Sequence, residues 1–351
     1  MIKEICVIGH PSFCGGADTE LLDQMKCWTK MGIKIYVLHT GPLTPYLNKL
    51  NMEKELGCKY LSPRQWNQAA GFHCISFCNG EFLSNLVHIK RYAKSTTFIN
   101  CMTWNFQKEI ECQSKGLIDF HLYQTQHAFD KISTKLSHLG TYRPLFFKPY
   151  FDQTRFPFYK NRPNDKFRFG RISRCDMTKY HSDQIEIYDK IESPVQKSGV
   201  VLGWDNRIKD RFRIPNQDIT NKNSSIYYKD YIQLLKEGGV TQQEFYQFCD
   251  VMIMSSDTFE NLPRVGFECI SSGTTLVVNN RGGWQLEVID GKTGFLCNNT
   301  QEFIDRSSLL ARDQNLKEEL KFAAKNKLDT EWGLEESIIS WEKVFNEWEK
   351  I

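Results

Sequence analysis

The stretch Asp257–Glu287, DTFENLPRVGFECISSGTTLVVNNRGGWQLE, decides the fold of this 351-residue chain. The short apolar run 251–254 before it has the length and composition of a buried strand. Phe267–Ile270 is predicted to form the first turns of a helix, and a second apolar strand follows at Thr274–Val278. Strands that alternate with helices in this way predict an α/β domain.

Two carboxylates flank the start of this helix. Glu260 lies on the loop at the carboxyl end of the first strand, where open α/β sheets bind their ligands, and Glu268 lies inside the helix. Such a pair can accept hydrogen bonds from the hydroxyls of a sugar and of a ribose, and the backbone N–H groups near 263–266 would face an anion. On spacing alone, two solvated glutamates, one paired with a lysine, are the commoner interpretation.

A longer pattern extends beyond these two residues. The segments Glu260–Glu268, 280–287 with its Gly-Gly-x-x-Glu, and Gly291–Leu296 resemble in order and spacing the E-x7-E signature of retaining GT-B glycosyltransferases, closest to family 4. The resemblance implies metal-independent transfer of a hexosyl or pentosyl group from a nucleotide-diphosphate sugar to a hydroxyl acceptor. It implies no other cofactor, and no D-x-D metal anchor is present in the sequence.

The resemblance covers nearly the whole chain and implies an α/β, GT-B fold, with two Rossmann-like domains facing each other across a cleft. Residues 1–158 would form the acceptor-side domain and 166–330 the nucleotide-sugar domain, joined by a turn-rich linker. Residues 331–351, with apolar side chains at helical spacing, would form a helix that crosses back to the first domain.

The resemblance also assigns residues to the donor site. Glu260 would hold the donor sugar, and Arg174 and Lys179 would neutralise the leaving diphosphate. The arginine of this pair remains a choice between Arg171 and Arg174. Further donor-binding residues implied by the resemblance are Gly15, Gly16, Arg171, Asn261, Leu262, Pro263, Arg264 and Glu268.

The acceptor is the least determined part. In the family, acceptor-side residues follow the strand predicted at Thr97–Met102, which suggests Thr103 and Trp104, although Trp104 could equally be a packing residue. The basic, aromatic stretch 155–174, with further bases at 207–213, suits either a nucleic acid or a solvated linker. A glycan, a small molecule or DNA with a hydroxymethylated, flipped base therefore remain open as acceptors.

Composition excludes several classes. A hydrophobic content of 40%, a charged content of 25% and a net charge of +3 are ordinary for a globular protein. No apolar run could span a bilayer, and the N-terminus is predicted to be a strand rather than a secretory signal, so we expect a cytoplasmic protein. The twelve cysteines include no C-x-x-C pair, and buried thiols are favoured over a zinc site at His73, Cys74 and Cys78.

Two other functions fit the same fold. A nucleotide-sugar epimerase would consume the donor without an acceptor, and a binding protein would hold it without chemistry. The absence of G-x-G-x-x-G lowers the case for a dinucleotide oxidoreductase. The polar segment 204–230 is predicted to be an irregular insertion.

Overall fold

The structure is a computed structural model, and it describes residues 2–9, 11, 15–40, 49–205, 207–208, 226–228 and 230–351, with the backbone alone at 49–51 and 226–228. Its contacts divide the chain into unit 1, residues 1–152 with 331–351, and unit 2, residues 153–330. Most of the predicted insertion 204–230, most of the loop 10–14 and most of the basic segment 207–213 lie outside the described residues.

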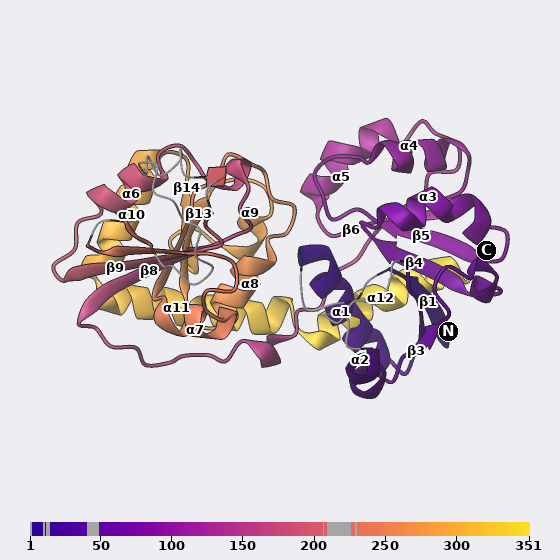
Figure 1. Cartoon of the computed structure of the whole chain (residues 1–351), viewed down its shortest axis with the longest axis horizontal. Coiled ribbons are helices and arrows are strands. Elements are labelled where there is room, and N and C mark those ends of the chain that lie inside the picture. The colour runs from indigo at the N-terminus through magenta and orange to yellow at the C-terminus, as the bar shows by residue number, and fades with distance from the viewer. Residues whose placement is uncertain are drawn as a thin grey trace. The chain divides into compact units, whose positions relative to one another are not determined.

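Unit 1 contains a seven-stranded parallel sheet in the order β3-β2-β1-β4-β5-β6-β7 (Figure 1). Its strands are β1 (Glu4–Ile8), β2 (Lys34–Leu38), β3 (Lys59–Leu61), β4 (His73–Phe77), β5 (Ser95–Ile99), β6 (Phe120–Tyr123) and β7 (Pro144–Phe146). Its helices are α1 (Gly16–Lys30), α2 (Lys49–Leu56), α3 (Gly80–Ile89), α4 (Gln107–Ser114), α5 (Gln126–Ile132) and α12 (Leu334–Trp348), with short 3-10 turns at Trp66–Ala69 and Ser133–Lys135.

Helices cover both faces of this sheet because its strands are apolar on both sides. In β1, Ile5 and Val7 pack into the core that contains α1 and α12, whereas Cys6 and Ile8 pack into the core that contains α3. The alternation follows from the two-residue period of a strand. Burial on both faces is typical of parallel sheets.

The C-terminal helix α12 belongs to unit 1, which confirms the predicted return of the last helix to the first domain. Trp341 packs edge-on against Trp28 of α1, with ring centroids 4.9 Å apart. Its indole Nε1 donates to Oε1 of Gln24 at 2.9 Å, so the buried N–H has a partner. The aromatic residues that recur at helical spacing in the sequence therefore form the contact that fixes α12.

Unit 2 contains a second seven-stranded sheet, in the order β10-β11-β9-β8-β12-β13-β14, parallel except for β10. Its strands are β8 (Lys166–Ile172), β9 (Gln196–Leu202), β10 (Ile226–Tyr228), β11 (Ile232–Leu235), β12 (Val251–Met254), β13 (Thr275–Asn279) and β14 (Gly294–Cys297). Its helices are α6 (Gln184–Lys190), α7 (Gln242–Phe248), α8 (Arg264–Ser271), α9 (Trp284–Glu287), α10 (Thr300–Arg312) and α11 (Gln314–Glu331), with 3-10 turns at Gln153–Arg155 and Met177–Lys179.

The strand order of unit 2 reverses between β8 and β12. The chain leaves β8 toward β9 on one side, and later returns to β12 on the other side of β8. The loops after β8 and β12 therefore diverge at their carboxyl ends, and such a switch point is the usual ligand site of an open α/β sheet. In unit 1 the corresponding point lies between β1 and β4.

One predicted helix boundary is wrong. Helix α8 begins at Arg264 rather than near Phe267, because Pro263, with φ −76°, already serves as its N-cap. The C-terminal part of unit 2 contains two helices, α10 and α11. They break at Asp313, which is extended and whose carboxylate accepts a hydrogen bond of 2.9 Å from the N–H of Leu316.

Candidate active site

The central feature of the unit 2 switch point is an ion pair between Lys179 and Glu260. Lys179 ends the 3-10 turn after β8, and Glu260 lies on the loop after β12. The Lys179 Nζ donates to Oε1 of Glu260, although 81 residues separate them in sequence. Their side chains are 22% and 18% exposed, so both charges remain within reach of a ligand.

Arg171, at the end of β8, bonds to both the loop after β8 and the loop after β12. Its side chain is fully buried, and its Nη1 donates to the backbone oxygen of Ser255 at 2.8 Å. Its Nη2 donates to the backbone oxygen of Lys179, and its guanidinium lies 4.4 Å from the ring centroid of Tyr180. Arg174, by contrast, is exposed on the loop that follows β8. Of the two arginines, Arg171 holds the loops together and Arg174 faces the solvent.

The loop 255–263 is also bonded to the next loop along the sheet. The N–H of Ser256 donates to Oδ1 of Asn279 at 2.8 Å, and the guanidinium of Arg281 donates to the backbone oxygen of Ser256. The same guanidinium lies 5.1 Å from the ring centroid of Phe259. These contacts fix the position of the loop before it reaches Glu260.

Two glycines allow the loop after β13 to pack against Glu260. A Cβ on Gly282 would lie 2.5 Å from the backbone oxygen of Glu260, and one on Gly283 would lie 2.0 Å from that of Asn261. The N–H of Gly283 donates to the same Glu260 oxygen at 2.9 Å. The close approach therefore requires residues without side chains at both positions.

Glu268, on α8, is half-buried and bonded to a tyrosine of α7. The hydroxyl of Tyr246 donates to Oε2 of Glu268 at 2.6 Å. Burial, and then the neighbouring Glu268 carboxylate, raise the pKa of Tyr246 well above its ordinary value, so it stays a hydrogen-bond donor. Tyr246 is fully buried and fixes the rotamer of Glu268.

The remaining predicted donor-binding residues of unit 2 form the entry to α8. Asn261 and Pro263 are buried, whereas Leu262 and Arg264 are half-buried. Pro263 precedes the first helical residue, so the N-terminal turn of α8 follows Glu260 closely in the chain. This end of the helix carries a partial positive charge and favours an anion.

Gly15 and Gly16 belong to unit 1, at the start of α1. Gly15 adopts φ +87°, a left-handed conformation that favours glycine, and serves as the N-cap of the helix. Its backbone oxygen accepts from Oγ1 of Thr19 at 2.8 Å. Among the described residues, no atom outside the adjoining backbone lies within 4 Å of a Cβ built on Gly16.

Thr103 and Trp104 lie on the loop after β5 in unit 1. Trp104 is 54% exposed, and its ring packs on Phe106 with centroids 4.6 Å apart. The Nδ2 of buried Asn100 donates to the backbone oxygen of Trp104 at 3.0 Å and to Oε2 of buried Glu109 at 2.8 Å. A buried polar network thus holds an exposed aromatic ring in place.

Most of the basic, aromatic stretch 155–174 is used within unit 2. Arg162 donates from Nη2 to the backbone oxygens of Tyr246 and Ser272 at 2.9 and 2.8 Å, at the ends of α7 and α8. Arg168 pairs with Asp165 at 2.7 Å. Three of its five interleaved aromatic residues are buried, namely Phe156, Phe167 and Phe169. The stretch therefore offers few groups for stacking on bases.

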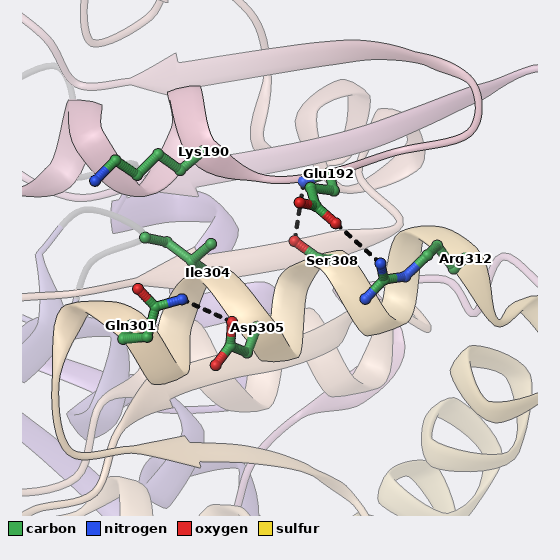
Figure 2. A pocket seen from close by; sticks show the side chains of 7 residues that line it. All are labelled: Lys190, Glu192, Gln301, Ile304, Asp305, Ser308 and Arg312. Atoms are coloured by element: carbon green, nitrogen blue, oxygen red, sulfur yellow. Dashed lines mark hydrogen bonds and ion pairs between the residues drawn. The ribbon is translucent and has the colours of Figure 1, made fainter.

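Outside the switch point, a surface pocket of about 280 Å³ lies between α6 and α10 (Figure 2). Its polar groups bond to one another: Arg312 pairs with Glu192 at 3.0 Å, and Gln301 donates to Asp305 at 2.8 Å. Because these groups satisfy each other, the pocket indicates no ligand.

Two features are absent from the described part of the chain. No group of three or more His, Cys, Asp or Glu side chains there is placed to hold a metal ion. None of the helices in that part combines the length and apolar character that a membrane crossing requires.

Several residues at the switch point escaped the sequence analysis. Tyr246 bonds to Glu268 of α8 and lies outside every motif, whereas Arg281 bonds to the loop that carries Glu260 and lies in the segment 280–287 without an assigned role. Glu287 ends the Gly-Gly-x-x-Glu pattern and is buried beneath the site. The signature segment 280–287 could have indicated Glu287 and Arg281, and no local signal indicates Tyr246.

Comparisons with known proteins agree with this geometry. The model of a family described as glycosyl transferases group 1 matches residues 152–327. Spore coat protein SA of Bacillus subtilis (strain 168) is 25% identical over 117 residues, which are 32% of this chain and 29% of that protein.

Solved structures match the chain over its whole length. Anabaena HepE in complex with UDP and glucose has a TM-score of 0.72 at 14% identity, and the match covers 98% of this chain and 100% of that one. TarM of S. aureus, with fondaparinux, α-GlcNAc-glycerol and UDP, has a TM-score of 0.70 at 11% identity, covering 98% and 100%. The predicted GT-B fold is therefore confirmed.

Proposed function

The chain belongs to the family of glycosyl transferases group 1, and from this premise we propose that it transfers a sugar from a UDP-sugar to a hydroxyl acceptor with retention of anomeric configuration. The Lys179–Glu260 pair at the switch point of unit 2 carries the proposal. The choice of UDP is supported by HepE and TarM, whose structures contain it.

The proposed donor site combines groups of opposite charge for the two ends of the donor. Glu260 would accept hydrogen bonds from sugar hydroxyls, and Lys179 would neutralise the diphosphate beside it. The N-terminal turn of α8 would add N–H donors to the same anion. Glu268, oriented by Tyr246, would accept from a ribose hydroxyl.

Arg174 is the arginine that we propose for the diphosphate. Arg171 is buried and bonded to the backbone of both loops, whereas Arg174 is exposed on the loop that leads to Lys179. Arg171 would then act by holding Lys179 in place.

In the proposed reaction, the bond between the anomeric carbon and the diphosphate oxygen breaks, and its electron pair goes to the diphosphate. The acceptor oxygen bonds to the same face of the sugar, and its proton passes to the departing diphosphate. Lys179, Arg174 and the α8 N-terminus would stabilise the growing negative charge, so the protein contributes positioning and electrostatics. This scheme requires no metal ion and no covalent nucleophile.

The acceptor side would lie in unit 1, with Thr103 and Trp104 as candidate contacts. The exposed ring of Trp104 could pack on the apolar face of a glycan or of a small polyol. A hydroxymethylated DNA base is the weaker candidate. The basic side chains and aromatic rings of residues 155–174, which would contact a nucleic acid, are largely bonded or buried within unit 2.

The test is release of the nucleoside diphosphate from UDP-, GDP-, ADP- and dTDP-sugars, with and without candidate acceptors and without added metal. We expect UDP release that an acceptor stimulates, and thermal stabilisation by UDP-sugars. Consumption of the donor with epimerisation and no release of UDP would instead establish an epimerase. Stabilisation by a UDP-sugar with no turnover on any acceptor would favour a binding protein. Absence of both stabilisation and turnover with every donor would overturn the proposed site.

A further inference from the structure

The carboxyl group of Glu287 lies against the first turn of α8. A Cβ built on Gly266 would lie 1.6 Å from Oε2 of Glu287 and 2.9 Å from the ring of Trp284. Gly266 is therefore the position in α8 that makes room for this carboxyl group. Together with Gly282 and Gly283, it allows the segment 282–287 to interlock with the segment 260–266.

Glu287 has no polar partner in this position. It is only 1% exposed, and neither of its carboxyl oxygens has a hydrogen-bond partner among the described residues. A buried polar group without a partner is costly, and an ionised one costs far more, so the structure favours the uncharged acid.

The charged groups around Glu287 come from three elements. Lys327 of α11 and Arg264 of α8 favour its ionised form, whereas Glu260 and Glu268 oppose it. Burial has the largest effect, and the pKa of Glu287 lies well above its ordinary value. The Lys327 Nζ meanwhile donates to the backbone oxygen of Leu286 at 2.6 Å.

We propose that Glu287 is a positioning residue of the donor site: as an uncharged acid it packs on Gly266 and fixes the first turn of α8 relative to the loop that carries Glu260. This inference rests on the proposed function. An ionised Glu287 would place a third negative charge beside Glu260 and Glu268, and it would push apart the two segments that the glycines allow to interlock.

The first experiment compares Glu287→Gln, Glu287→Asp and Glu287→Ala with the exposed neighbour control Leu286→Ala. We expect Glu287→Gln to keep UDP-sugar turnover within about threefold of the wild type, because the amide has the same shape and no charge. Glu287→Ala and Glu287→Asp leave space over Gly266, and we expect kcat to fall by about 100-fold in the alanine variant. An equal loss in Glu287→Gln and Glu287→Ala would overturn the proposal, because the role would then require the carboxylate.

The pH profile separates this role from simple packing. In the wild type, ionisation of Glu287 should contribute an alkaline limb to kcat, and that limb should be absent from Glu287→Gln. An identical alkaline limb in the two proteins would also contradict the proposal.

The second experiment needs no substrate. The ordinary pKa of a glutamate is 4.5, and the folded-state pKa is raised, so the wild type gains stability from the protonated acid at low pH and loses it as the pH rises from 4.5 toward the folded pKa. The unfolding midpoint of Glu287→Gln should therefore rise relative to the wild type as the pH increases. A constant difference at every pH would show that folding does not raise the pKa of Glu287, and it would overturn the inference. Lack of turnover with every donor would overturn the proposed function alone, because this measurement does not use the donor.

Discussion

The two sheets differ at the edge where the carboxyl ends of their strands lie: the polar groups there are partly exposed in unit 2 and buried in unit 1. In unit 2, Lys179 and Glu260 form an ion pair in which each side chain keeps about a fifth of its surface exposed, at 22% and 18%. In unit 1, Asn100 and Glu109 are buried beneath the loop that presents Trp104. Both edges lie at the carboxyl ends of parallel strands.

This difference separates two uses of polar side chains. Buried groups such as Asn100, Glu109 and Arg171 satisfy backbone oxygens or one another, so they determine the shape of a loop. Partly exposed groups such as Lys179 and Glu260 keep charge available to a ligand. The comparison can be tested by substitutions that affect stability in one case and activity in the other.

The largest expected effect comes from Arg171→Met. It removes a charged donor from three oxygens, those of Lys179, Ser255 and Gln184, and each hydrogen bond from a charged group contributes about 1.5–3 kcal/mol. We expect the free energy of unfolding to fall by at least about 3 kcal/mol in urea titration. Arg174→Ala, on the exposed loop, is the control and should change it by about 0.5 kcal/mol or less. Equal stability of the two variants would remove the positioning role assigned to Arg171.

Glu260→Gln should affect activity without affecting stability. We expect kcat for UDP-sugar transfer to fall by about 100-fold, or about 2.7 kcal/mol, because the charge that faces the donor is lost. The free energy of unfolding should change by less than about 1 kcal/mol, since the ion pair is partly exposed. Glu186→Gln, which removes the exposed pair with Lys190 on α6, provides the matched control and should keep full activity. Full activity in Glu260→Gln would mean that the donor site is elsewhere.

Asn100→Ala tests the buried network of unit 1. The substitution removes the donor to the backbone oxygen of Trp104 and one of two donors to Oε2 of Glu109, which keeps the N–H of Phe106 at 3.1 Å. We therefore expect a loss of about 2 kcal/mol in unfolding free energy. Because the network lies in unit 1, the KM for the acceptor should rise while the KM for the donor stays unchanged. A comparable rise in donor KM would contradict this division of roles between the edges. Asn85→Ala, at a half-buried position of α3, serves as the control.

Tyr246→Phe should have the smallest effect. It removes the hydrogen bond to Glu268 and nothing else, so we expect the donor KM to rise about tenfold, or about 1.4 kcal/mol, with little change in kcat. Tyr188→Phe is a matched control, because the buried hydroxyl of Tyr188 has no hydrogen-bond partner among the described residues. If the two variants had the same donor KM, Glu268 would not depend on Tyr246.

The sequence determined much of the fold. The informative patterns are local: the apolar run at 251–254, the spacing of Glu260 and Glu268, and the aromatic period of the last helix. The periods of a strand and of a helix can each be recognised within a few residues. The resemblance that these patterns carry predicted the GT-B fold and the return of α12 to the first domain. The start of α8 and the break at Asp313 are harder to predict from the sequence, because a single capping residue determines each boundary.

Only the tertiary structure decided which of these residues meet and which are buried. Lys179 bonds to Glu260 across 81 residues because parallel strands bring their carboxyl-end loops to one edge. Arg171 and Arg174 carry the same charge, and the sequence does not separate their roles. Burial separates them, because Arg171 is buried between the loops and Arg174 is exposed. Glu287 lies uncharged beneath Gly266 for the same reason, since the state of an acid depends on the solvent and charges around it rather than on its neighbours in the chain.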